Sequence, residues 1–428
     1  MQFLLILGLA IIGLLAGGAI AYVVGAASVL SFIAGGSSDF LAILPQRIFS
    51  QLDVFAFLAM PLFILTGDLM NRGGVTRALI DLAMALVGRF KGGLGHVNIM
   101  ASVFFAGVSG SAVADAAAMS NTLVPAMRER GYSDGYAAAV TAASSIIGPI
   151  IPPSVILIFY GALMGTSVPA LFAAGVVPGL LLAAVLMAMN TCFAHRHDHP
   201  GGAEIEIPRL LPALWRALPA LSLPLIILGG VLFGFATPAE SAAIAVIAAL
   251  LIGLARRDLT WAGIVKAGER TAVMLGAVFV ILCAIAAFSY LAALYQLPRL
   301  LGEEVAALGL GPLGYLMAVN VVFLLAGMVM DVKAAVALLA PIVVPVALQM
   351  GADPVHLGIV ISFNITLGLL TPPFGGVLII IATVTGANYW SLVRAVAPFL
   401  FVEILLLVVL TLVPGITLWL PRMLGLVS

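Results

Sequence analysis

The sequence predicts an all-α polytopic membrane protein with inverted repeats, two re-entrant helical hairpins and two broken helices. One observation is composition: of 428 residues, 63% are hydrophobic and only 8% are charged, which lies far outside the range of soluble domains. A second is an internal repeat at an offset of 220 residues, which sets residue 107 on residue 327. A third is a Pro-Pro pair at the matching place in each repeat.

Apolar segments follow one another along the chain and give the expected crossings. Between Gly135 and Ala194 there is no Asp, Glu, Lys, Arg or His, which suffices for more than one helix at roughly 20 residues each. The first 34 residues lack the basic start of a signal peptide, so we expect them to be retained. The expected segments are 3–34, 53–70, 93–126, 135–166, 169–194, 217–254, 271–298, 311–347, 355–388 and 395–420.

Charge and cysteine usage exclude several classes of site. The net charge is zero, which excludes a basic face for nucleic acid. Two cysteines are too few for a disulfide framework or a thiolate metal site. His195, His197 and His199 alternate along a hydrophilic Pro-Gly loop without a cysteine partner, which favours a solvated loop over a metal site.

The internal repeat matches residues that break or tighten helices. "GVSGSAVADAAAMSNTLVPAM" (107–127) falls on "GMVMDVKAAVALLAPIVVPVA" (327–347), and "IIGPIIPPS" (146–154) falls on "TLGLLTPPF" (366–374). The coinciding pairs are Gly107 and Gly327, Pro125 and Pro345, Gly131 and Gly351, Gly148 and Gly368, Pro152 and Pro372, and Pro153 and Pro373. The chain is therefore predicted to be a duplication.

Flanking charges indicate that the two repeats have opposite orientations. Basic residues flank the first matched segment and mostly acidic residues flank the second: Arg89, Lys91, Arg128 and Arg130 against Glu303, Glu304 and Asp353. By the positive-inside rule the ends of the first segment are cytoplasmic and those of the second lie outside. Segment 93–126 must then enter and return, with its tip near 109–111, and 311–347 is its counterpart with a tip near 328–331. Inverted repeats with interrupted helices are typical of secondary transporters.

The two tips and the two Pro-Pro breaks together predict sodium sites. A helix that ends at such a tip leaves carbonyl groups free, and serine hydroxyls add further hard oxygen donors. A Pro-Pro pair disfavours α conformation at the preceding residue, which bares carbonyls at 148–151 and 368–371. The predicted sodium-binding residues are Ser109, Ser111, Gly148, Ile151, Pro153, Gly327, Met330, Asp331, Gly368, Thr371 and Pro373.

Four polar residues near the tips and breaks are candidates for substrate binding, and each has a structural alternative. They are Ser111, Asp115, Asn364 and Thr366. Asp115 is either part of the transport site or a buried structural acid, and the last two are either substrate contacts or bonds between helices. Asp331 is expected as an acid at the tip rather than in a surface ion pair with Lys333, since residues two apart do not share a helical face. Glu240 is either a ligand or a helix cap.

The motifs "GVSGSAVADAAA", "GPIIPPS", "ATPAESAA" (236–243) and "GLLTPPFG" resemble those of the large membrane subunit of tripartite ATP-independent periplasmic (TRAP) transporters. The resemblance covers essentially the whole chain. It implies sodium-driven, elevator-type uptake of an organic acid across the bacterial inner membrane, with Na⁺ as coupling ion and no enzymatic activity. It also implies two partners: a small membrane subunit, expected as a separate polypeptide because the chain starts with the first repeat, and a periplasmic substrate-binding protein.

The position of irregular backbone predicts how the chain divides for transport. Residues 93–166 and 311–388, each a hairpin followed by a broken helix, form the transport domain. Residues 1–92 and 167–310 supply scaffold helices and connecting arms, and 389–428 supply a C-terminal scaffold helix. The substrate stays open among sialic acid, a C4-dicarboxylate and a keto acid.

Two alternatives come from other patterns. One is a stand-alone sodium/dicarboxylate carrier of the same superfamily. The other is an intramembrane serine protease of the rhomboid kind, because "GVSG" (107–110) matches its G-x-S-G pattern and His356 is a downstream histidine. His356 lies beside Asp353 at a predicted outer boundary, however, and a protease leaves the duplicated Pro-Pro breaks unexplained.

Overall fold

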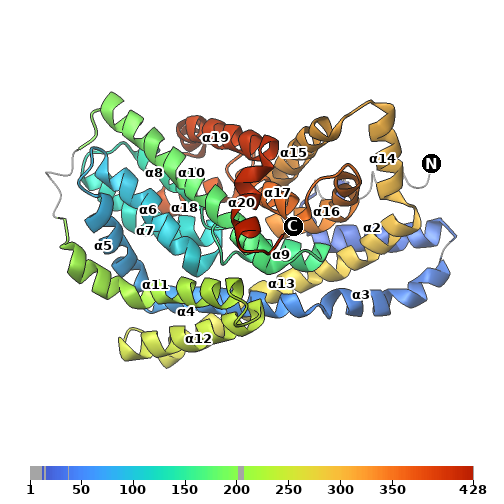
Figure 1. Cartoon of the computed structure of the whole chain (residues 1–428), viewed down its shortest axis with the longest axis horizontal. Helices are drawn as coiled ribbons and strands as arrows, with labels where there is room; N and C mark the ends of the chain where they lie inside the picture. The colour runs from blue at the N-terminus through green and yellow to red at the C-terminus, as the bar shows by residue number, and fades with distance from the viewer. Residues whose placement is uncertain (1–11, 14–15, 37, 201–206, 428) are drawn as a thin grey trace.

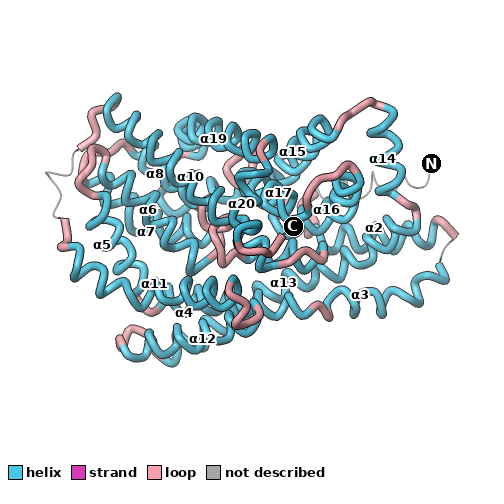
Figure 2. Tube along the Cα trace, in the orientation of Figure 1, coloured by secondary structure: helices cyan, strands magenta, loops and turns pink. Residues whose placement is uncertain are grey.

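The computed structural model describes the chain except residues 1–11, 14–15, 37, 201–206 and 428. Residues 3–11 of the first predicted segment and 201–206 of the polar loop thus lie outside the described residues. Throughout the described part the regular structure is helical (Figure 2). Among the described residues, seven helices are long and apolar enough to cross a membrane, or eight if the bent pair Ser38–Leu52 and Phe55–Arg72 counts as one span. The predicted all-α membrane fold is confirmed.

The first repeat contains α2 (Ile20–Ala34), α3 (Leu44–Leu52), α4 (Ala59–Arg72), α5 (Val75–Val87), α6 (Gly93–Ser109), α7 (Ala112–Glu129), α8 (Asp134–Ser145), α9 (Val155–Met164) and α10 (Val168–Arg196). The second contains α11 (Leu210–Leu232), α12 (Pro238–Ala255), α13 (Trp261–Leu294), α14 (Leu297–Ala307), α15 (Pro312–Val329), α16 (Val332–Gln349), α17 (Pro354–Gly368), α18 (Gly376–Thr385), α19 (Tyr389–Leu412) and α20 (Pro414–Met423). With the offset of 220 residues, α2 corresponds to α12, α3 and α4 together correspond to α13, and α5 to α10 correspond in order to α14 to α19.

Contacts cross between the repeats, as they do in a duplicated chain with pseudo-twofold symmetry. Helix α18 packs on α7 while its counterpart α9 packs on α16, and α19 packs on α8 while α10 packs on α17. Likewise α12 packs on α4 and α2 packs on α13. In Figure 1, α3, α4, α11, α12 and α13 form a layer along one edge, which we call the scaffold layer, with the remaining helices from α5 to α20 to one side of it.

Both predicted hairpins and both predicted breaks are present. The first hairpin joins α6 to α7 at Gly110, whose φ of +59° suits glycine, and the second joins α15 to α16 at Met330 and Asp331. Helix α8 ends at Ser145 and α9 starts at Val155, and α17 ends at Gly368 and α18 starts at Gly376. Each break contains its Pro-Pro pair, and both Pro-Pro bonds are cis.

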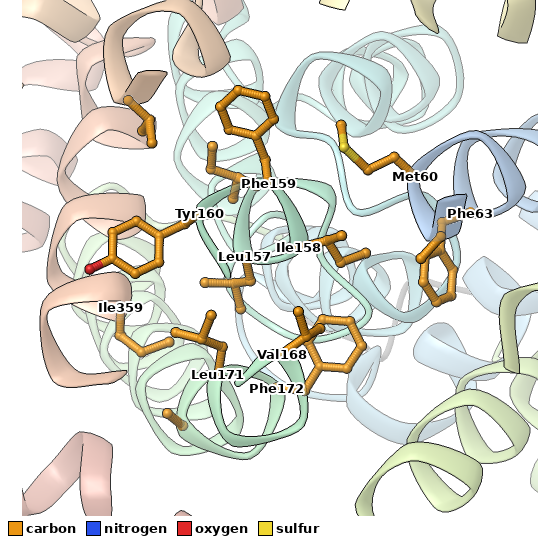
Figure 3. Close-up of a cluster of buried hydrophobic side chains, with 14 of the residues drawn as sticks. Met60, Phe63, Leu157, Ile158, Phe159, Tyr160, Val168, Leu171, Phe172 and Ile359 are labelled. Carbon is orange, nitrogen blue, oxygen red and sulfur yellow. The ribbon is translucent and has the colours of Figure 1, made fainter. Parts of the chain in front are cut away.

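The second half of the first broken helix is anchored in the apolar core. Figure 3 shows side chains of α9 packed among those of α4, α10 and α17: Leu157, Ile158, Phe159 and Tyr160 against Met60, Phe63, Val168, Leu171, Phe172 and Ile359. The four α9 side chains are fully buried. Between membrane helices such contacts stabilise through close van der Waals packing rather than through transfer out of water, so α9 is densely packed in this conformation.

Candidate functional site

A cavity of about 490 Å³ lies between the two hairpin tips and the scaffold layer. The first tip contributes residues 109–114 and the second contributes residues 331–333. Scaffold helix α4 lines it with Ile64, Gly67, Asp68 and Asn71, and α13 lines it with Arg270, Met274, Ala277, Val278 and Ile281. Spacings of three and four residues put each of these sets on one helical face. One wall therefore belongs to the hairpins and the other to the scaffold layer.

Three helices begin at this cavity. The first turn of α7 lines it after Ser111, whose hydroxyl accepts from the backbone N–H of Ala114 at 3.4 Å. The first turns of α16 and α9 line it at Val332 and Val155. The first N–H groups of a helix lack intrahelical partners and carry partial positive charge. Such ends favour an anion, for example a carboxylate.

Ser109 and Gly148, two predicted sodium ligands, meet at Asp115, which the sequence offers as a substrate candidate. Asp115 is 1% exposed, and its Oδ1 accepts a hydrogen bond from the Ser109 hydroxyl. A methyl group on Gly148 would lie 2.2 Å from Asp115 Oδ2, so the carboxylate lies against the backbone of the break. Oδ2 is buried without a hydrogen-bond partner among the described residues. A buried carboxylate oxygen of this kind fits a hard cation such as Na⁺.

The second predicted sodium site has a different construction. Gly327 and Gly368 pack backbone to backbone: a methyl group on Gly368 would lie 2.4 Å from the carbonyl carbon of Gly327. Thr371 Oγ1 donates to the carbonyl of Leu367 at 2.9 Å. The hairpin and the break therefore meet here as predicted, but through glycine and threonine rather than through a buried acid.

Asp331 is paired with Lys333, which corrects the expectation from the sequence. Asp331 is the N-cap of α16 and accepts from the backbone N–H of Lys333 at 3.0 Å. Its carboxylate also lies 3.3 Å from Lys333 Nζ. The helical-face argument was wrong because an N-cap residue lies outside the helix, where its side chain folds over the first turn.

Other predicted sodium ligands have contacts of their own. The carbonyl of Pro373 accepts from the Tyr389 hydroxyl at 2.7 Å. Ile151 packs on α10, where a methyl group on Gly179 would lie 2.2 Å from its Cγ1. The carbonyl of Pro153 lies beside the first tip, 2.7 Å from where a methyl group on Gly110 would be. Met330 packs against the apolar core.

Two of the four substrate candidates line the cavity. Ser111 and Thr366 do so, whereas Asp115 lies behind the first tip. Asn364 is fully buried and links helices: its Nδ2 donates to Asn320 Oδ1 at 2.9 Å, and Asn320 Nδ2 donates to Thr411 Oγ1 at 2.8 Å. Asn364 thus has the interhelical contacts of its structural alternative.

The structure adds residues that the sequence analysis missed. Asp68 and Arg270 face each other across the scaffold wall of the cavity, with Arg270 Nη1 3.1 Å from Asp68 Oδ1. The signal was present, since Asp68 is an acid inside the apolar segment 53–70, and acids in such segments are usually functional. In the first repeat Asn98 also links α6 to α8, because its Nδ2 donates to Thr141 Oγ1 at 2.7 Å.

Two remaining sequence alternatives are settled by contacts. Glu240 caps α12 in a capping box, with the Thr237 backbone N–H 2.8 Å from Glu240 Oε2. His356 Nδ1 lies 2.8 Å from Thr417 Oγ1, while the Ser109 hydroxyl donates to Asp115. The serine and the histidine that a protease dyad requires are therefore each engaged elsewhere.

The histidine loop is only partly solvated. His195 and His197 are exposed, as expected. His199 is 8% exposed and lies between two aromatic rings, 4.9 Å from Tyr132 and 4.4 Å from Tyr136 between centroids. Burial, then the nearby charges of His197 and Lys91, lower the pKa of His199. His199 thus packs against the N-terminal end of α8.

Comparisons with known proteins agree with this architecture. The family model described as "Tripartite ATP-independent periplasmic transporter, DctM component" matches residues 7–416. The chain is 36% identical to the sialic acid TRAP transporter large permease protein SiaM of Vibrio cholerae, over 92% of each chain. It is also 36% identical to the C4-dicarboxylate TRAP transporter large permease protein DctM of Pseudomonas aeruginosa, over 94% of this chain and 93% of that one.

A solved structure shares the fold. The YdaH transporter of Alcanivorax borkumensis superimposes with a TM-score of 0.64, covering 97% of this chain and 98% of its own, at 14% sequence identity. The family match extends over almost the entire sequence and the described helices carry at least seven candidate membrane spans. The chain therefore belongs to the DctM family of tripartite ATP-independent periplasmic transporters, as a multi-pass component of the bacterial inner membrane rather than an enzyme.

Proposed function

We propose that the protein couples sodium entry to the uptake of an organic acid, which a periplasmic binding protein delivers. The observation that carries this proposal is the cavity at which two hairpin tips and three helix N-termini meet, with the buried Asp115 directly behind one tip. Helix N-termini suit the carboxylate, and buried oxygens suit the cation. The names of the similar permeases, for sialic acid and for C4-dicarboxylates, support an acidic substrate.

Sodium and the carboxylate would occupy neighbouring but distinct positions. Ser109, Asp115 and the backbone near Gly148 would hold Na⁺, which supplies positive charge inside the low-dielectric interior. Ser111 and the first N–H groups of α7 would hold the substrate carboxylate, because the start of α16 is already capped by the Asp331 carboxylate. An ionised Asp115 without a cation would repel that carboxylate, so binding of the two is expected to be coupled. The repeat favours at least two sodium ions, with Gly327, Gly368 and Thr371 at the second.

Alternating access in this proposal is a sliding motion of the hairpins along the scaffold layer. The hairpins and broken helices, in 93–166 and 311–388, form the moving part, and α4, α11, α12 and α13 belong to the static part. Helices α10 and α19 pack on α17 and α8. These contacts favour adding both helices to the moving part, in place of the static role assigned to 167–310 and 389–428 as a whole.

The proposed partners are a small membrane subunit and a periplasmic binding protein. Exposed apolar and aromatic side chains on α11 and α12 would face lipid or the small subunit, among them Leu211, Trp215, Ile247 and Leu251. The alternative, a stand-alone sodium/dicarboxylate carrier, needs neither partner.

Uptake by proteoliposomes tests the proposal. The chain is reconstituted with its small subunit, and accumulation of sialic acid, succinate and a keto acid is followed with and without an inward sodium gradient and a binding protein. We expect accumulation of one acid only when gradient and binding protein are both present. Uptake without the binding protein would favour the stand-alone carrier, and uptake that ignores sodium would contradict the coupling.

A further inference from the structure

Three charged residues form a cluster at the scaffold wall of the cavity, which we call the scaffold triad: Asp68 and Arg270 line the cavity, and Arg72 lies next to Asp68 outside its lining. Asp68 Oδ2 lies 2.8 Å from Arg72 Nε within α4, and Asp68 Oδ1 lies 3.1 Å from Arg270 Nη1 on α13. Each carboxylate oxygen therefore has its own guanidinium. One carboxylate and two guanidinium groups leave the triad with a net charge of +1.

Burial differs strongly within the triad. The Asp68 side chain is 9% exposed, so its charge depends on both arginines for compensation. The Arg270 side chain is 58% exposed and lines the cavity. Its bond to Asp68 uses one of five N–H donors, so the guanidinium can offer others to a ligand. Asp68 thus holds Arg270 in place while Arg270 faces the cavity.

The excess positive charge comes from Arg72, which pairs with Asp68 from behind the scaffold wall and does not itself line the cavity. On the hairpin wall the cavity is lined by Asp331 and Lys333, which form a pair without net charge. Lys266 and Glu269 also belong to α13 but are not among the residues that line the cavity. The hairpin wall offers the N-terminus of α7 to one acidic group, and the scaffold wall offers the Arg270 guanidinium to another.

We propose that the scaffold triad is a second anion-binding site in the cavity, at which Arg270 binds an acidic group of the substrate that the hairpin tips do not hold. Guanidinium groups bind carboxylates in charge-assisted, often bidentate, geometry. The site therefore selects substrates with a second acidic group at the end away from the first carboxylate. This inference rests on the proposed function for the identity of the ligand, though its electrostatic part does not.

Charged thiol reagents measure the electrostatic effect of the scaffold triad in the absence of substrate. Met274 lies one turn after Arg270 on the same face of α13 and lines the cavity. In a background with Cys192→Ala and Cys283→Ala, we would make Met274→Cys in the full transporter complex. Reaction rates with an anionic and a cationic methanethiosulfonate reagent of similar size are then compared at low ionic strength.

The expected result is a preference for the anionic reagent that depends on Arg270. A unit charge about one helical turn away changes the ratio of anionic to cationic rates by about tenfold even at the dielectric of bulk water, because it attracts one reagent and repels the other. Arg270→Gln should therefore lower the ratio by about tenfold, and Arg270→Lys should keep most of it. Arg299→Gln is the matched control, because Arg299 is exposed on α14, paired with Glu303 at 2.9 Å, and does not line the cavity.

Each outcome decides the inference. An unchanged ratio in Arg270→Gln overturns it, as does a cysteine that neither reagent reaches. If Arg270→Gln fails to fold, raising the salt concentration in the Met274→Cys protein should abolish the preference, and a salt-independent ratio would count against the triad. In uptake assays Arg270→Gln should raise KM about tenfold for a dicarboxylate and little for a monocarboxylate. If Arg270 sets the ratio of anionic to cationic reaction rates as expected but the protein takes up no organic acid, the proposed function is contradicted and the anion-binding site is not.

Discussion

The Oδ2 atom of Asp115 determines what can bind behind the first tip. Its Oδ1 is bound by the Ser109 hydroxyl, and its Oδ2 lies against Gly148 without a partner among the described side chains and backbone groups. A buried carboxylate with one unpaired oxygen is unfavourable unless a cation or proton accompanies it. The neighbouring Ser111 faces the cavity instead.

Replacing Asp115 by Asn distinguishes a role in sodium binding from a structural role. The amide keeps the size of the side chain but removes the charge that would hold Na⁺, so the sodium concentration for half-maximal uptake should rise about tenfold, the order of one charge-assisted interaction. Ser111→Ala is the comparison, and it should mainly raise KM for the acid. Sodium and substrate titrations of uptake measure both. Wild-type sodium dependence in Asp115→Asn would return Asp115 to a structural role.

His199 gives the fold a dependence on pH. Its pKa lies below the ordinary value of 6.5 because it is buried and lies near His197 and Lys91. The unfolded chain therefore binds the proton more readily, so stability falls as pH drops through 6.5 towards the lower folded pKa. The thermal midpoint of the wild type should fall more between pH 7.5 and 5.5 than that of His199→Phe, which keeps a ring between Tyr132 and Tyr136. His195→Phe, at an exposed position, should behave as the wild type, and equal pH dependence in all three would contradict this role.

At the scale of elements, glycines set how closely helices approach. The second hairpin lies on the second break through the backbones of Gly327 and Gly368. The first tip approaches α4 at Gly67, where a methyl group would lie 2.9 Å from the carbonyl oxygen of Val108. Small residues allow such contacts between membrane helices. They explain why the irregular segments of the two repeats can share one cavity.

Gly368→Ala tests the contact between the second hairpin and its break. The added methyl group meets backbone rather than a flexible side chain, so α15 and α17 must separate, at a cost of about 1–3 kcal/mol. The thermal midpoint in detergent should fall by several degrees. Gly276→Ala in α13 is the matched control, because no atom lies within 4 Å of its added methyl group. An equal midpoint in both variants would show that the backbones are not tightly packed.

At the scale of the whole molecule, the proposed transport cycle requires the hairpins to move against the scaffold layer. Gly107 of α6 touches Pro224 of α11, where a methyl group on Gly107 would lie 2.7 Å from Pro224 Cβ. This is the kind of contact that a sliding motion has to break. It joins one helix of the first hairpin to one helix of the scaffold layer.

A disulfide across that contact should stop transport. Gly107→Cys with Pro224→Cys, in the background without Cys192 and Cys283, brings the two Cβ atoms to 2.7 Å, so α6 and α11 must part by about an ångström to reach the Cβ separation of a disulfide. Oxidation should abolish uptake and reduction should restore it, while each single variant stays active under oxidation. A fully formed cross-link with uptake at the wild-type rate would contradict the sliding motion.

The sequence by itself determined the all-helical membrane fold, the duplication, both hairpin tips and both breaks. It could do so because apolar length, glycine and the Pro-Pro pairs at 152–153 and 372–373 act on the local backbone, wherever the helices pack later. Only the tertiary structure decided that Asp68 meets Arg270, 202 residues further along the chain, that Asn364 joins Asn320, and that His199 is buried between Tyr132 and Tyr136. Side-chain partners on different helices depend on which faces meet, and crossed packing of two repeats brings together positions that no local pattern relates.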